Sequence, residues 1–131
     1  MGTLVSLGSA LALAVAMGLT REQYVTLLPK SVTTAISMDV AAELGGIAAL
    51  TGAIVILTGI AGNLLAETVC KVFHITDPIA KGVGIGTSAH AVGTSKALQM
   101  GEVEGAMSGL SIAVAGVLTA VLCPVFVNFI N

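Results

Sequence analysis

The pattern of apolar and polar positions divides the chain into three long apolar stretches and two segments of mixed polarity. The apolar stretches cover about residues 2–20, 44–70 and 105–130. Each is long enough to cross a hydrocarbon core of about 30 Å, which takes about 20 helical residues. The mixed segments cover residues of about 27–44 and 78–100. They are too apolar for ordinary loops and too polar for spans that face lipid.

The two mixed segments contain hydroxyl side chains, glycines and scattered charges. Backbone that departs from a helix at membrane depth is tolerated only inside protein or beside water. We therefore expect both segments to be buried in the protein or to line a cavity. The predicted fold is an all-α membrane protein, a polytopic helical bundle with two interrupted or re-entrant helices in a single transmembrane domain over residues 1–131.

The two halves of the pattern also align with each other. Ala41–Gly45 matches Ala97–Gly101, and with one extra residue Gly59 falls on Gly116. Alanine- and glycine-rich membrane helices can align by chance, but here the order of elements matches as well: a polar segment, then a long apolar helix. Such units are typical of transporters. If the polar segments turn back inside the membrane, the repeat is inverted; if they cross it, the units are parallel. We favour inversion, which brings both polar tips to the midplane.

Composition narrows the classes of function. Of 131 residues, 56% are hydrophobic and 9% are charged, whereas a soluble domain has about a quarter charged residues. The net charge is −2 with no basic run, so we expect the lipid bilayer and not nucleic acid as a partner. We find no nucleophile–base pair and no metal-ligand spacing, and therefore expect no catalytic residues, no metal, no cofactor and no enzyme activity.

The first mixed segment has a candidate binding cluster in Lys30, Ser31, Thr33 and Thr34. Free N–H groups at the start of a half-helix can bind an anion, and Lys30 adds a positive charge nearby. The alternative is that the hydroxyls bond back to their own helix and that Lys30 extends to the membrane interface. For the cluster as a whole, we favour a binding site.

The second mixed segment has a candidate cluster in Thr87, Ser88, His90 and Thr94. His90 is the one histidine in an apolar stretch, and an intramembrane ionisable residue suggests a proton relay or a substrate ligand. The alternative is a neutral imidazole that ties two helices together. Lys96, further along, could attract an anion or mark the membrane edge.

Several other polar residues have less specific interpretations. Asp39 and Glu43 share a helix face, where they could bind a cation or proton or lie in headgroup water, and we keep Asp39 with His90 as a candidate for ion coupling. Glu67 and Lys71, also four residues apart, predict an interfacial ion pair. Asn63 is expected to join helices.

Helix boundaries are marked by local chemistry. Asp77 followed by Pro78 predicts a helix start, with Asp77 as the N-cap and Pro78 at the first helical position. No basic region precedes the apolar N-terminal stretch, so we expect a retained span and not a cleaved signal peptide.

Three motifs together resemble the LrgB/CidB family of antiholin-like membrane proteins, which includes the YohK-type proteins. They are Leu28–Thr34 (LPKSVTT), Leu44–Ile47 (LGGI) and Asp77–Thr94 (DPIAKGVGIGTSAHAVGT). Plant plastid glycolate/glycerate transporters have a similar domain. The resemblance runs from about residue 25 to the C-terminus.

The resemblance implies a multi-pass protein of the bacterial inner membrane and two functions. The plant relatives imply transport of small organic hydroxycarboxylates, and the polar clusters suit a carboxylate. The bacterial members imply an antiholin-like regulator of murein hydrolase export and cell lysis, acting with an LrgA/CidA-type holin-like partner. We favour the transport interpretation as the mechanism.

The chain departs from the family pattern in three ways. Ala35 stands where a proline is usual, which leaves the position of the first break open, and Lys96 stands where an arginine is common. Family members are also usually longer, with further spans before the first one here. The chain is therefore expected to be a C-terminal portion that needs a second copy, as a homo-oligomer, or a missing N-terminal half to enclose a pathway.

Overall fold

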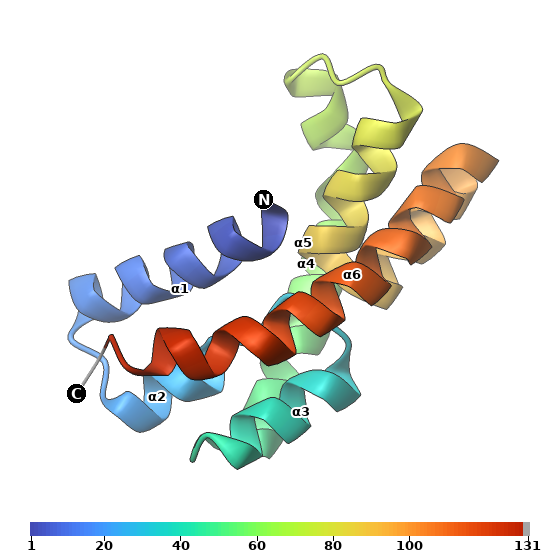
Figure 1. Ribbon diagram of the computed structural model, residues 1–131. Helices are drawn as coiled ribbons and strands as arrows, with labels where there is room; N and C mark the ends of the chain where they lie inside the picture. Colours follow the sequence, from blue (N-terminus) through green and yellow to red (C-terminus); the bar gives the residue numbers. More distant parts are fainter. Residues whose placement is uncertain (130–131) are drawn as a thin grey trace.

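The computed structural model describes residues 1–129 and folds them into six helices. In chain order these are α1 (Gly2–Met17), α2 (Arg21–Leu27), α3 (Thr34–Glu43), α4 (Ala48–Val72), α5 (Pro78–Met100) and α6 (Glu102–Val127), as Figure 1 shows. No strand occurs among the described residues. The predicted all-α class is confirmed.

Two of the helices in residues 1–129, α4 and α6, are long and apolar enough to cross a membrane. α4 has 25 residues and α6 has 26. Only 22% of the most apolar 18 residues of α4 and 33% of those of α6 are buried. Large side chains on them face outward, including Leu64 at 73% exposure and Val117 at 67%. A core helix of a soluble protein would bury such side chains, whereas lipid accepts them. The chain is an all-α membrane protein.

The end of α1 and the start of α4 differ from the limits of the predicted apolar stretches because of local backbone geometry. α1 has 16 residues, about 24 Å of helix, and ends where Gly18 takes a left-handed φ of 62°. α4 begins at Ala48 because Gly45, with a φ of 87°, turns the chain before it. Residue 130, the expected end of the third stretch, lies outside the described residues.

The start of α5 confirms the predicted cap. The Asp77 carboxylate accepts a hydrogen bond of 2.8 Å from the Ala80 N–H, and Pro78 occupies the first helical turn. The cap satisfies a backbone donor that the helix itself leaves unpaired. The direction in which α5 leaves the α4–α5 turn is therefore set by local sequence.

α5 folds back on itself at His90, which we call the second break. His90 has φ 42° and ψ −139°, outside the helical region. A Cβ built on Gly93 would lie 2.9 Å from Ile85 Cγ2, although residues eight apart in a straight helix are separated by about 12 Å. The first arm (78–89) and the second arm (91–100) therefore form a hairpin, too short in either arm to cross a bilayer. This is the re-entrant form of the predicted interrupted helix.

The first mixed segment is interrupted at residues 28–33, which separate α2 from α3 and which we call the first break. The buried Ser37 hydroxyl closes it by donating to the Pro29 carbonyl at 2.6 Å. The Thr26 hydroxyl accepts from the Ile47 N–H at 2.9 Å, so that the end of α2 is fixed to the start of α4. Side chains thus replace the hydrogen bonds that the missing helical turn would have made.

Two contacts join the halves of the chain at positions that correspond in the sequence repeat. A Cβ on Gly59 of α4 would lie 2.9 Å from Val92 Cβ of α5, and one on Gly116 of α6 would lie 3.1 Å from Ile36 Cδ1 of α3. In the register of the sequence repeat, Gly59 corresponds to Gly116 and Ile36 to Val92. Each long helix therefore contacts the broken segment of the other half.

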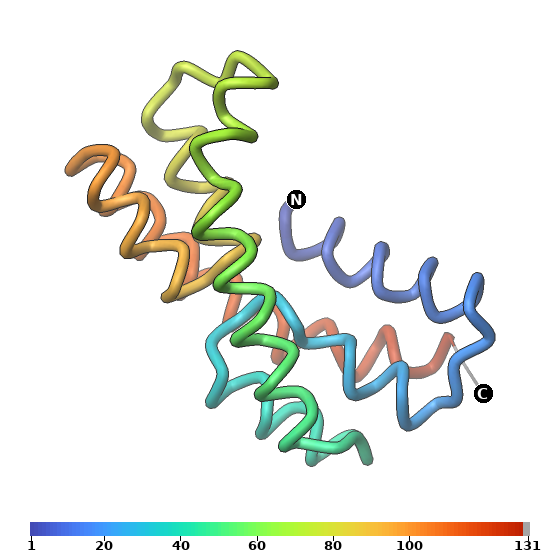
Figure 2. Tube along the Cα trace, turned by 180° about the vertical axis from the view of Figure 1, so that it is seen from behind, coloured from blue at the N-terminus to red at the C-terminus, as the bar shows by residue number. Residues whose placement is uncertain are grey.

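The directions of the long helices agree with an inverted repeat. From its beginning to its end, α4 rises in Figure 1, whereas α6 descends from the upper right to the lower left. Figure 2 shows the same opposed courses from behind, with the first and second breaks turned toward the middle of the molecule. The apolar core packs beside this centre, where Leu7 of α1, Tyr24 of α2 and Cys123 of α6 are buried.

Candidate functional site

A cleft of about 520 Å³ lies between α1, the first break, α4 and the first arm of α5. Its wall is mainly apolar, with polar side chains gathered from four parts of the chain: Ser6, Ser9, Lys30, Ser31, Thr58, Thr87 and Ser88. Ligand sites in proteins commonly combine an apolar wall with a few convergent polar groups. The cleft therefore brings both predicted clusters to one place, through Lys30 and Ser31 from the first and Thr87 and Ser88 from the second.

Lys30 forms the charged part of the cleft. Its Nζ donates to Ser31 Oγ at 3.4 Å and to Ser6 Oγ at 3.5 Å, and the Ser6 hydroxyl donates to Ser31 Oγ at 2.7 Å. Lys30 is half-buried and Ser31 is buried. Proline at position 29 and the break that follows it keep Lys30 out of a regular helix, so that its ammonium reaches α1 across the cleft.

The Lys30 ammonium has no carboxylate partner among residues 1–129. The one ion pair in that part of the chain joins Lys96 Nζ to Glu67 Oε1 at 3.4 Å, and no carboxylate oxygen lies within 4.0 Å of Lys30 Nζ. A cation removed from water without a counter-ion raises the free energy of the site. An anion bound in the cleft would supply the missing charge.

Thr87 and Ser88 line the cleft from α5, and their hydroxyl protons are already used. Thr87 donates to the Val83 carbonyl at 2.8 Å and Ser88 to the Gly84 carbonyl at 2.7 Å. Such bonds to the preceding turn are common for hydroxyls within helices. Each hydroxyl can still accept a hydrogen bond, and each must rotate away from its carbonyl before it can donate to a ligand.

The structure places His90 behind the cleft, where it is 2% exposed and does not line the wall. Its Nε2 lies 2.9 Å from the Val55 carbonyl oxygen. A carbonyl can only accept, so Nε2 carries the proton of this hydrogen bond. Gly59 leaves room for the ring, since a Cβ there would lie 2.6 Å from His90 Cε1. His90 joins the second break to α4 in this structure, and its role in binding or coupling remains a prediction.

The other predicted site residues also lie outside the cleft lining. Thr33 and Thr34 begin α3, and Thr33 makes no side-chain cap hydrogen bond. Thr94 donates to the His90 carbonyl at 3.0 Å and lies 2.7 Å from Ser108 Oγ, where it connects the second arm to α6. Asp39 is exposed on α3. Substrate contacts for these residues, and ion coupling by Asp39, remain predictions.

Two predictions about charged and polar residues have clear outcomes. The pairing of Glu67 with Lys71 is wrong, because the Glu67 carboxylate turns toward Lys96 on the second arm of α5 instead. Asn63 joins helices, as predicted, by donating to the Val92 carbonyl at 2.8 Å and to Ser95 Oγ at 3.0 Å. Both contacts hold the second arm against α4.

Three polar residues of the cleft were not predicted from the sequence. Ser6 and Ser9 stand three residues apart in α1, and Thr58 stands in α4. Each belongs to a stretch that composition assigns to apolar scaffold. The available signal was the spacing of the serines, which puts two hydroxyls on one face of an otherwise apolar helix.

Comparison with known proteins gives a consistent match along the chain. The model of the LrgB-like family matches residues 1–129. Antiholin-like LrgB proteins of Bacillus mycoides (strain KBAB4), Bacillus cereus (strain B4264) and Bacillus anthracis (strain CDC 684) are each 37% identical to it over 130 residues. The match covers 99% of this chain and 56% of each relative, so the chain spans about half their length. No solved structure matches the chain.

Proposed function

The chain belongs to the LrgB-like family, and from that premise we propose that it moves small organic carboxylates, hydroxycarboxylates among them, across a membrane. The observation that carries this proposal is the Lys30 ammonium, which faces a cleft at the junction of two broken helices without a carboxylate partner in residues 1–129. A small carboxylate supplies the opposite charge and oxygens that can accept from an ammonium and from hydroxyls.

The neighbours of Lys30 favour a carboxylate that also carries a hydroxyl group. Ser6 and Ser31 lie within 3.5 Å of the Lys30 Nζ and can reorient to donate to a bound anion. In the same cleft, the Thr87 and Ser88 oxygens can accept a hydrogen bond from a substrate hydroxyl while they keep their own bonds to α5. The residues around Lys30 therefore suit the charge, and those from α5 suit the hydroxyl.

The opposed helices suit alternating exposure of such a site. Substrate sites of transporters with inverted repeats lie near the bilayer midplane between the repeats, beside interrupted helices. In our proposal the chain acts in a bacterial inner membrane as a multi-pass protein. A second copy, or the further length that its relatives have, encloses the pathway.

Uptake into proteoliposomes tests this proposal. The full chain should be reconstituted at a low and at a high protein-to-lipid ratio, so that copies can associate. It should then take up labelled glycolate, glycerate or pyruvate with saturation. Lys30→Gln should abolish saturable uptake, whereas Arg21→Gln, which removes an exposed cation of α2 outside the cleft, should leave it unchanged. Uptake that does not saturate, or that Lys30→Gln leaves intact, contradicts the proposal.

The matched relatives are named antiholin-like, which favours a second candidate function, that of an antiholin-like regulator. In this proposal the chain regulates murein hydrolase export and lysis through a holin-like partner, as the family resemblance implies. The exposed apolar faces of α4 and α6 would then matter more than the cleft. Measuring uptake and association with a holin-like protein in the same Lys30→Gln variant separates the two. Loss of uptake with retained association supports transport, and loss of neither supports the partner-binding function.

A further inference from the structure

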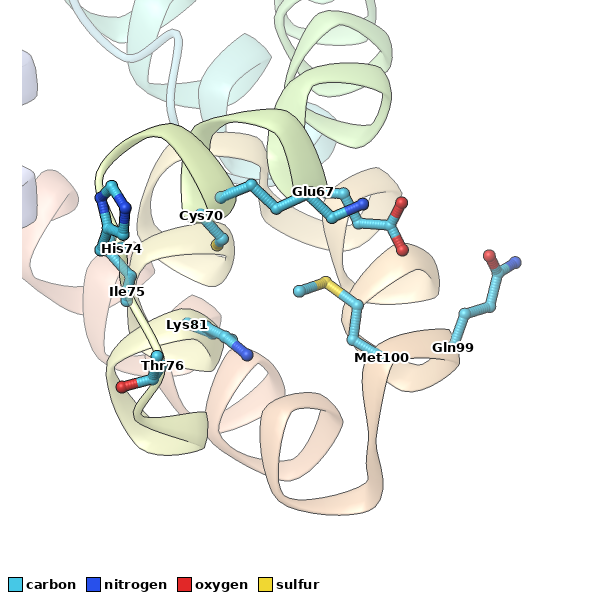
Figure 3. Close-up of a pocket in the computed structure, with 9 residues that line it drawn as sticks. Glu67, Cys70, His74, Ile75, Thr76, Lys81, Gln99 and Met100 are labelled. Carbon is cyan, nitrogen blue, oxygen red and sulfur yellow. The ribbon is translucent and has the colours of Figure 1, made fainter.

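A second hollow lies at the far end of α4 and α5, away from the cleft, and is rich in charge. It measures about 510 Å³ and includes Lys71 from the last turn of α4 and Lys81 from the first turns of α5. Figure 3 shows Lys81 extending into this hollow, opposite Met100 and below Cys70. We call it the cationic hollow.

The charges in the cationic hollow are unevenly paired. Glu67 also lines it, but its carboxylate is held by Lys96 at 3.4 Å. Lys71 and Lys81 have no carboxylate oxygen within 4.0 Å among residues 1–129. The cationic hollow lies directly after the apolar part of α4. At such a point a membrane helix meets the headgroup region, where lysines are common.

An apolar groove continues from the cationic hollow between α4 and α5. It measures about 370 Å³ and shares Cys70, Ile75 and Lys81 with the hollow, so the two spaces adjoin. Its wall carries Leu65 and Val69 from α4. From Lys81 it reaches Ser88, seven residues or about 10 Å along α5.

The cationic hollow and the apolar groove together suit one kind of ligand. A free anion would gain from the lysines but nothing from the apolar groove, and an apolar molecule would gain from the groove but not from the lysines. A phospholipid has both parts in this order, with a phosphate at the membrane surface and an acyl chain directed inward. Each lysine near an anionic surface favours binding about fivefold.

We propose that the cationic hollow and the adjoining groove bind an anionic phospholipid, with its phosphate at Lys71 and Lys81 and an acyl chain against Leu65 and Val69. The cationic hollow shares no residue with the carboxylate cleft, whereas the groove meets the cleft at Gly62, Leu65 and Ser88. Lipid binding at the lysines does not depend on the proposed transport. By filling the groove, the lipid would brace the first arm of α5 against α4.

Native mass spectrometry of the purified full chain in detergent, titrated with dioleoyl phosphatidylglycerol or dioleoyl phosphatidylcholine, tests the charged part. Wild type should prefer phosphatidylglycerol. The double variant Lys71→Gln/Lys81→Gln should bind it about thirtyfold more weakly, and Arg21→Gln should bind it like wild type. Equal binding by the double variant and wild type, at equal helix content by circular dichroism, overturns the proposal.

The variant Gly84→Leu tests the apolar part. Gly84 lines the groove, and a Cβ there meets nothing within 4 Å, so the larger side chain should fill the groove without disturbing the helix packing. It should weaken binding of phosphatidylglycerol, whereas Gly84→Ala should not. If inorganic phosphate displaces the lipid, and Gly84→Leu binds phosphatidylglycerol as tightly as wild type does, the site recognises only a free anion. The lipid proposal then fails.

Discussion

The imidazole Nε2 of His90 lies 2.9 Å from the carbonyl oxygen of Val55, across the interface between the second break and α4. This bond holds a residue with a positive φ of 42°, a conformation that costs about 1–3 kcal/mol outside glycine. The fold-back of α5 therefore depends on a contact with another helix as well as on its own sequence.

Substitution of His90 by glutamine separates structural support from proton coupling. Gln can still donate to the Val55 carbonyl but does not titrate, so we expect a loss of stability of under about 2 kcal/mol. His90→Ala, which also leaves a cavity, should lose about 2–4 kcal/mol. Unfolding titrations measure both. A pH profile of uptake that is the same in His90→Gln and wild type would contradict the predicted coupling role.

Gly59 provides the space for the second break, and its replacement tests the packing there. A Cβ at Gly59 would lie 2.6 Å from His90 Cε1, so Gly59→Ala should destabilise the protein by about 1–3 kcal/mol. Gly109→Ala is the matched control, because a Cβ at that position of α6 meets nothing within 4 Å. The control should be neutral or stabilising by up to about 1 kcal/mol, since alanine favours helix. Equal effects of the two changes on unfolding would contradict the packing.

Ser37 should be the main support of the first break. Its buried hydroxyl donates to the Pro29 carbonyl at 2.6 Å, so Ser37→Ala leaves that carbonyl without this partner and should cost about 1–3 kcal/mol. Ser111→Ala is a suitable comparison, because the Ser111 hydroxyl bonds back to the Met107 carbonyl of its own helix. Denaturation of the two variants should show the larger loss for Ser37→Ala, and a reversed order would count against the proposed support.

Local chemistry explains which features of the fold could be predicted from the sequence. The cap at Asp77 involves residues three apart, and the apolar stretches that became α4 and α6 follow from length and composition alone. The repeat was also visible in the sequence, where Gly59 aligns with Gly116. In the structure, a side chain at either position would meet the other half of the chain.

The direction of individual side chains could not be predicted, because it depends on which helix packs against each break. His90 points to Val55 and not into the cleft because α4 has a glycine beside the ring, a fact of tertiary structure. Ser6 enters the site for a similar reason: α1 lies across the first break, so that a hydroxyl from an apolar helix reaches Lys30. The motifs located the breaks correctly but not all of the residues around the cleft.

Direct binding of a labelled carboxylate to the purified chain tests the central claim, that Lys30 provides the charge of an anion site. Scintillation proximity measurements with labelled glycolate should show saturable binding to wild type and to Arg21→Gln. Lys30→Gln should bind about 10- to 100-fold more weakly, because a charge-assisted hydrogen bond contributes about 1.5–3 kcal/mol, and Lys30→Arg should retain part of the affinity. Binding to Lys30→Gln that equals binding to wild type would contradict the account.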